Sequence, residues 1–338
     1  MQDPADVCAE TSDLLYEAVP EFRDGIWQLL SCEVSEELER RGRRLVFCRV
    51  TYRAELGQPT MAHLVVKVCG PGRGHVAAEA LQQLSEAGFR LPSVDLVPQL
   101  YGHEPRRGTL VQSQARGITW RAILASDPAI DPAALPAASA RAAEWLARLH
   151  HTSASVVSYG KEDSLISEQR MSEELLAAFP RRPALAAALD AFRANTPNAP
   201  NRREHMALSH GDFHPGQVLL DGHRVTVLDF DTFGLREAAF DVGYCIAQLL
   251  AMSYFQLRDF APGAIAARAF WAAYPQGAGM PWSRVRFHVA RGFIQILHYA
   301  RRGLAGRRPE MLTLWPSLIT QCLASDGPDI LPRIARSL

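Results

Sequence analysis

The sequence predicts an α+β protein in which a small β-rich lobe precedes a larger, mostly helical lobe. Two observations support this class. Apolar and polar residues alternate in three segments before residue 70, and alanine- and leucine-rich helical segments dominate after residue 114. Because a chain of 338 residues exceeds what one hydrophobic core comfortably serves, we expect two domains, at 1–113 and 114–338.

The first lobe is predicted to be an antiparallel sheet with two helices. Its strands are expected at about 27–34, 44–54, 61–69, 94–101 and 108–113. An apolar stripe at helical spacing predicts a helix at about 8–19, and a run of strong helix formers predicts another at 76–87.

The second lobe is predicted to be helical apart from one β-hairpin. Asp221-Gly222 stands between two apolar runs, which is typical of a tight turn, so we expect the hairpin within about 206–230. The helices are expected at about 136–151, 165–195, 239–255, 263–274, 283–302 and 309–324. Pro180 and Pro183 should break the second of them.

Composition argues against several classes of protein. A net charge of zero without a basic and aromatic motif predicts no nucleic-acid partner. No apolar run reaches the roughly 18 to 20 residues of a membrane span, and the acidic start is unlike a signal peptide, so we expect a cytoplasmic protein without a membrane partner. The six cysteines lack paired spacing, which is typical of reduced thiols. No pattern indicates an oligomeric state.

The segment from Asp212 to Asp231 has the pattern that phosphoryl transfer needs. This reaction requires a cation on the phosphates, metal ligands and a carboxylate beside the attacking hydroxyl. Four residues separate Asp212 from Gln217, which is the spacing of a kinase catalytic loop. The chain then returns to Leu-Asp-Phe-Asp, ending at Asp231, where a kinase would have its Asp-Phe-Gly magnesium site.

With these motifs the chain resembles the phosphotransferase family that includes aminoglycoside and choline kinases. LSHGDFHPGQVLL, VTVLDFDTFG and AAFDVGY stand in the family's order, and the resemblance extends over about 25–325. It implies a two-lobed protein-kinase-like fold. It also implies an enzyme that uses ATP and Mg²⁺ to move a γ-phosphoryl group onto a hydroxyl.

The resemblance implies a role for each residue of these motifs. Asp212 would orient the acceptor hydroxyl and accept its proton. Gln217, which stands where the family has asparagine, and Asp229 would bind Mg²⁺ through oxygen. Asp231 would either join the metal site or hydrogen-bond the loop. Asp241 would either brace the catalytic loop or cap the helix that it opens.

In the first lobe, the resemblance makes Lys67 the lysine that binds the α- and β-phosphates, with Glu79 as its ion-pair partner. Only two of the 36 basic residues are lysines, so a lysine inside an apolar strand is conspicuous. By order along the chain, the backbone of Val111, Gln112 and Ser113 would contact adenine.

The turn between the first two strands departs from the family. A glycine-rich phosphate loop should lie there, but residues 39–44 read ERRGRR, with a single glycine. Three alternatives remain open. Backbone amides around Gly42 bind the phosphates, the arginines bind them, or the turn is merely solvated.

The sequence does not identify the acceptor. A small-molecule hydroxyl is the leading hypothesis, and a Ser or Thr hydroxyl of a biosynthetic peptide is the alternative. A pseudokinase that binds nucleotide without turnover is a third hypothesis, because Gln217 and the glycine-poor turn both depart from the family.

Charge leads to a prediction about the acceptor. Residues 262–338 hold 10 arginines against three carboxylates, and five of the arginines lie in one predicted helix. They are Arg284, Arg286, Arg291, Arg301 and Arg302. If they line the acceptor pocket, polycationic aminoglycosides should be poor substrates. The alternative is that they only solvate an outer helix face.

Overall fold

The computed structural model describes residues 4–40, 42–54, 57–126, 131–153, 164–196, 206–275 and 280–335. The chain forms two compact units. Met1–Gly117 and Asp221–Thr232 make the first, and Ile118–Leu220 and Phe233–Leu338 make the second. The boundary expected after residue 113 therefore lies at Gly117. Residues 221–232, which we had assigned to the second lobe, belong to the first, because strand β10 (Arg224–Val227) pairs in parallel with β4 (Asp95–Leu96).

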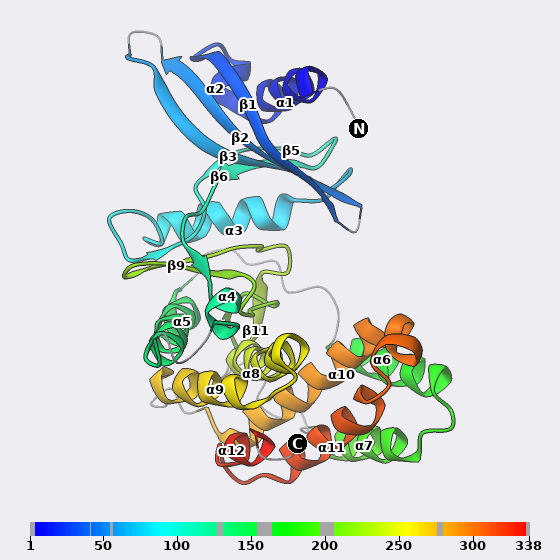
Figure 1. Ribbon diagram of the computed structural model, residues 1–338. Helices are drawn as coiled ribbons and strands as arrows, with labels where there is room; N and C mark the ends of the chain where they lie inside the picture. Colours follow the sequence, from blue (N-terminus) through cyan, green and yellow to red (C-terminus); the bar gives the residue numbers. More distant parts are fainter. Residues whose placement is uncertain are drawn as a thin grey trace. The chain divides into compact units, whose positions relative to one another are not determined.

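The first unit contains a five-stranded antiparallel sheet in the order β1-β2-β3-β6-β5 (Figure 1). Its strands are β1 (Trp27–Arg40), β2 (Arg43–Ala54), β3 (Thr60–Val68), β5 (Leu100–Glu104) and β6 (Thr109–Ser113). The strand expected at 94–101 is divided into β4 and β5, because Pro98 between them has no N–H for a sheet ladder.

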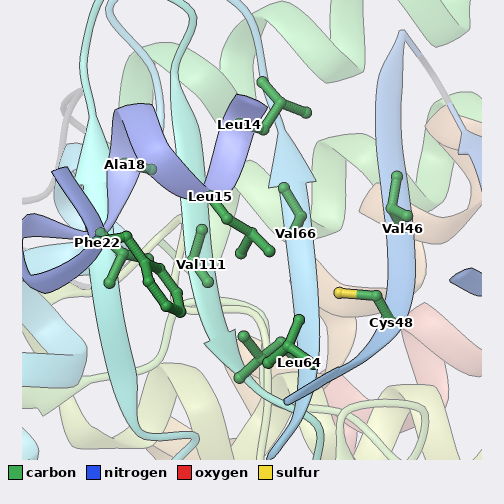
Figure 2. Packing of buried hydrophobic residues seen from close by; sticks show 11 residues of the cluster. Leu14, Leu15, Ala18, Phe22, Val46, Cys48, Leu64, Val66 and Val111 are labelled. Carbon is green, nitrogen blue, oxygen red and sulfur yellow. The ribbon is translucent and has the colours of Figure 1, made fainter. Parts of the chain in front are cut away.

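Helix α1 (Pro4–Ala18) and the short α2 (Pro20–Arg23) close the core of this sheet (Figure 2). In Figure 2, Leu15 points toward Val66 and Val111, and all three side chains are fully buried. Alternation along β2 and β3 places Lys67 on the opposite face of the sheet from this core. Burial of each large apolar side chain contributes about 1.5–3 kcal/mol, so the core holds the strand that carries the lysine. Helix α3 (His75–Glu86) follows this strand.

The second unit is mostly helical, as predicted. Its helices are α4 (Trp120–Leu124), α5 (Ala134–His151), α6 (Ser164–Ala178), α7 (Pro183–Ala194), α8 (Ala238–Leu257), α9 (Ala261–Ala273), α10 (Trp282–Arg307), α11 (Met311–Ala324) and α12 (Ile330–Ala335). Helix α8 packs against α9 and α10 (Figure 1). The buried rings of Trp120, Trp145 and Trp315 fill the core of this unit. The six-residue α12 was not predicted.

Short strands frame the catalytic loop of the second unit. The hairpin turn at Asp221-Gly222 falls between β9 (Val218–Asp221) and β10, within the predicted range. However, β8 (Met206–Ser209) does not extend that hairpin. It pairs antiparallel with β11 (Gly234–Glu237), a strand that the sequence did not predict. The two-residue β7 (Ile118–Thr119) pairs with β9.

Helix α8 is long and apolar enough to cross a membrane by length and composition alone, although Asp241 interrupts its apolar run. In the structure 78% of its apolar window is buried inside the fold, and a buried core helix passes the same test. Asp241 lies in its first turn, is 0% exposed and accepts a hydrogen bond from His210 N.

Candidate active site

Lys67 and two aspartates form a charged cluster in the first unit. Lys67 Nζ lies 2.7 Å from Asp229 Oδ1 and 2.9 Å from Asp231 Oδ1. Burial by itself would lower the pKa of Lys67, but the two carboxylates outweigh burial and raise this pKa above its ordinary value. The lysine is therefore a permanent cation, as phosphate binding requires.

The backbone of the Asp-Phe-Asp segment is unusual. Asp229 has a φ of 64°, in the left-handed region that residues other than glycine rarely adopt. Between the two aspartates, Phe230 is buried and anchors the segment. Because strained backbone persists where the surrounding structure enforces it, and gathers at functional sites, this geometry marks the segment as functional.

Arg43 joins the cluster from the start of β2. Its Nη1 lies 2.5 Å from Asp231 Oδ2 and 4.0 Å from Asp229 Oδ1. The next residue, Arg44, instead forms ion pairs with Glu10 and Glu37. The sequence analysis left phosphate binding by these arginines as one of three alternatives, but nothing in the run distinguished Arg43 from its neighbours.

The predicted ion pair between Lys67 and Glu79 is not formed in the part of the chain that the structure describes. Both ion pairs of Lys67 go to the aspartates at 229 and 231. Glu79 lies on the exposed side of α3, which buries Ala80 and Leu81 instead. The lysine is neutralised by carboxylates that are distant in sequence, and helix spacing alone could not reveal them.

The predicted adenine contact at 111–113 is not supported by the hydrogen bonds of the first unit. Val111 and Gln112 lie in β6, between β3 and β5. Their backbone groups therefore form the hydrogen bonds that join β6 to these two strands. Val111 is also fully buried in the core. The Ser113 N–H donates to Gln99 O at 2.8 Å. The adenine contact of these three residues therefore stays a prediction.

Asp229 and Asp231 fit a magnesium site. An oxygen of each carboxylate lies within 2.9 Å of one cationic nitrogen, Lys67 Nζ, so both already face a common positive charge. Mg²⁺ binds through one or two carboxylates and takes its other oxygen ligands from phosphates and water. Among the residues that the structure describes, no three His, Cys, Asp or Glu side chains gather as a metal site.

In the second unit, Asp241 braces the catalytic loop. Its carboxylate accepts hydrogen bonds from Ser209 Oγ at 2.8 Å, His210 N at 2.7 Å and Gly211 N at 2.9 Å. His150 Nε2 lies 3.3 Å away. Burial by itself would raise the pKa of Asp241, but the contacts with His150 and Ser209 lower this pKa to about 2. Of the two alternatives for Asp241, the structure therefore supports the brace.

This brace predicts a pH-dependent stability. Because the folded pKa of Asp241 lies below the ordinary value of about 3.9, the ionised carboxylate contributes about 2 kcal/mol above about pH 4. The contribution is lost as the pH falls through about 2. We expect Asp241→Asn to lower the free energy of unfolding at pH 7 by about 3 kcal/mol, since an amide cannot accept all three hydrogen bonds.

Urea titrations between pH 2 and 7 test this expectation. Asp326→Asn serves as the control, because that side chain is fully exposed. The acid-induced loss of stability should be smaller in Asp241→Asn than in the wild type and unchanged in Asp326→Asn. Equal pH profiles for all three proteins would contradict the brace.

Asp212 lies in the braced loop with its side chain accessible. The carboxylate is 36% exposed, and His214 Nε2 lies 3.8 Å from its Oδ2. The Asp212 N–H donates to His210 Nδ1 at 3.2 Å. The adjacent Phe213 is fully buried and stacks on Trp145. The backbone is thus anchored while the carboxylate remains open to a substrate, as a general base requires.

Tyr244 and Gln248 extend this site from α8. Burial raises the pKa of Tyr244 well above its ordinary value, and the neighbouring Asp212 carboxylate raises this pKa further. The hydroxyl therefore stays protonated next to Asp212. Gln248 Nε2 donates a hydrogen bond to Tyr244 Oη at 2.7 Å. Sequence reasoning missed both residues, although Tyr244 ends the AAFDVGY motif.

Gln217 lies in the turn that leads from the catalytic loop into β9. Its N–H donates to His214 O at 2.9 Å, which closes the turn. Gln217 belongs to the second unit, whereas Asp229 and Asp231 belong to the first. Its role as a metal ligand therefore stays a prediction.

The arginine side chains that the structure describes in α10 do not form a free cationic wall. Arg284 pairs with Glu237. Arg291 is 7% exposed, and its Nε lies 2.7 Å from Glu168 Oε1. The other described arginines are also held, Arg286 by Ser325 O and Arg301 by Glu174, whereas the Arg302 side chain lies outside the described residues. The charge argument against polycationic acceptors thus loses its structural basis, because each paired charge is neutralised locally. The poor use of aminoglycosides stays a prediction without that support.

Comparisons with known proteins agree with this architecture. A family model described as a phosphotransferase enzyme family matches residues 49–288. Among solved structures, the chain is similar to a choline/ethanolamine kinase family protein from Mesorhizobium loti. The two are 16% identical, with 97% of this chain and 99% of that chain covered and a TM-score of 0.54. A search of curated proteins found no match.

Two further similar structures are antibiotic kinases. Aminoglycoside phosphotransferase APH(4)-Ia, in a ternary complex with AMP-PNP and hygromycin B, is 15% identical over 86% of this chain and 94% of that chain, with a TM-score of 0.57. Amicoumacin kinase, in complex with AMP-PNP and Ca²⁺, is 14% identical over 95% of this chain and 93% of that chain, with a TM-score of 0.56. At these identities the likeness shows the fold alone, and it confirms the predicted protein-kinase-like class.

Proposed function

Because the chain belongs to the phosphotransferase enzyme family, we propose that it is an ATP- and Mg²⁺-dependent kinase that phosphorylates a hydroxyl of a small molecule. The observation that best supports this proposal is the cluster in which the buried Lys67 contacts Asp229 and Asp231. This cluster provides a phosphate-binding cation next to two hard oxygen ligands. The braced and accessible Asp212 supplies the third requirement of phosphoryl transfer.

In this proposal the acceptor oxygen attacks the γ-phosphorus, the bond to the bridging oxygen breaks, and ADP leaves. Lys67 binds the phosphates. Asp212 orients the acceptor hydroxyl and accepts its proton on a carboxylate oxygen. Tyr244 stays protonated next to that carboxylate. Mg²⁺ held by Asp229 and Asp231 would neutralise charge on the transferring phosphate.

The small-molecule acceptor is supported by the similar structures. Those named above are a choline/ethanolamine kinase family protein and kinases bound to hygromycin B and amicoumacin, and a spectinomycin phosphotransferase is similar as well. No feature of the described residues favours a peptide acceptor. We also propose a cytoplasmic location, where ATP is available and the six free cysteines would stay reduced.

The test of this function is a screen of acceptors with ATP and Mg²⁺. The library should hold neutral, zwitterionic and polycationic alcohols together with a Ser- and Thr-containing peptide mixture. Mass spectrometry should find one small molecule that gains a single phosphate, with stoichiometric ADP. Nucleotide binding without any phosphorylated product would favour the pseudokinase instead, and efficient transfer to kanamycin-like compounds would refute the predicted exclusion of polycations.

A further inference from the structure

The cluster around Lys67 contains a second cation that the proposed mechanism does not use. Lys67 and Arg43 face Asp229 and Asp231, so two positive charges balance two negative ones. The two cations differ in their surroundings. The Lys67 side chain is 10% exposed, within the strand, whereas the Arg43 side chain is 36% exposed, at the end of an open turn.

The register of the sheet distinguishes Arg43 from Arg44. Lys67 pairs with Leu45 across β2 and β3, and residues two apart along a strand share a face. Arg43 therefore lies on the face of Lys67. Arg44 lies on the opposite face, toward α1, where it pairs with Glu10. Only the first of these two arginines can serve the cluster.

Metal and arginine compete for the same carboxylate. Arg43 Nη1 contacts Asp231 Oδ2 at 2.5 Å, and Mg²⁺ would take oxygen ligands from that side chain. A guanidinium displaced from Asp231 would keep its charge and would be attracted by the polyanionic phosphates. Its planar fork of donors suits phosphate oxygens better than an ammonium would.

The turn between β1 and β2 differs from a kinase phosphate loop. It has one glycine, Gly42, whose φ is 71°, where a kinase has a glycine-rich loop with several close backbone amides. We infer that Arg43 replaces that loop. It binds the terminal phosphates of the nucleotide and leaves Asp231 when the metal–nucleotide complex binds. This inference rests on the proposed kinase function and adds a phosphate-binding residue to it.

Binding measurements on Arg43→Ala test this role without catalysis. Isothermal titration with ATP, ADP and adenosine, in the presence of Mg²⁺, should show ATP affinity reduced by about tenfold, ADP affinity reduced less, and adenosine affinity unchanged. Arg43→Lys should recover part of the loss. Arg49→Ala is the matched control, because Arg49 lies on the same strand and face and pairs only with the exposed Glu33 among its described contacts. It should bind all three ligands as the wild type does.

A second measurement separates phosphate binding from a structural role. Mn²⁺ binding without nucleotide can be measured from the electron paramagnetic resonance signal of the free ion. Arg43→Ala should bind Mn²⁺ at least as tightly as the wild type, because the arginine that competes for Asp231 is absent. Opposite effects on Mn²⁺ and ATP support the inference. Weaker binding of Mn²⁺ or adenosine, or unchanged binding of ATP, would overturn it and leave the kinase function standing. A wild-type protein that binds no nucleotide would overturn the proposed function, and the inference with it.

Discussion

Asp212→Asn is expected to fold as the wild type does, to bind ATP with unchanged affinity, and to lose phosphoryl transfer by about 10² to 10⁴-fold. The loop should survive the change because Asp241 holds its backbone and Phe213 is buried behind it. Asparagine has the shape of aspartate, but it cannot accept the proton of the acceptor hydroxyl. The loss should therefore appear in kcat and spare nucleotide binding.

Steady-state kinetics with the identified acceptor, together with ATP titration, measure this effect. Asp221→Asn is the control, since Asp221 is an exposed residue of the hairpin turn. It should retain the wild-type kcat. If the kcat of Asp212→Asn were within a few-fold of the wild-type value, Asp212 would not be the general base.

Asp229→Ala is expected to reduce kcat/KM by about 10²-fold or more, because a metal ion contributes several kcal/mol to charge stabilisation in the transition state. Asp229 also contacts the phosphate-binding lysine, at 2.7 Å. By contrast, Gln217→Asn should stay within about tenfold of the wild type, since it preserves an amide oxygen.

The dependence of rate on Mg²⁺ concentration distinguishes these two variants. Asp229→Ala should need a much higher Mg²⁺ concentration than the wild type to reach half of its maximal rate. Gln217→Asn should need only a slightly higher concentration. Thermal unfolding should show that both variants are folded. If Gln217→Asn were as inactive as Asp229→Ala, the longer side chain would be required at this position, and the tolerance that we expect would be wrong.

Much of the fold follows from local pattern. Period-two alternation predicted β2 and β3, and proline positions predicted the division between α6 and α7. Pairings between distant segments were missed, such as β8 with β11 and β4 with β10. Such pairings depend on the packing of elements that are far apart in the chain, and no local pattern encodes them.

The sequence by itself determined the chemistry of the candidate site. The spacing of Asp212, Gln217 and Asp229 predicted phosphoryl transfer, and the family resemblance of these motifs implied the protein-kinase-like class. These signals are readable because the reaction needs particular side chains at set positions along one chain.

Only the tertiary structure decided which charges meet. In the structure Lys67 forms ion pairs with Asp229 and Asp231 instead of Glu79. Arg43 also forms an ion pair with Asp231. The tertiary structure also neutralised the described arginines of α10 that had suggested a cationic wall. Charge in a sequence can be counted, but its effect depends on partners and burial, because interaction energy falls with distance and with the dielectric around each pair. Those distances exist only once the strands and helices have packed.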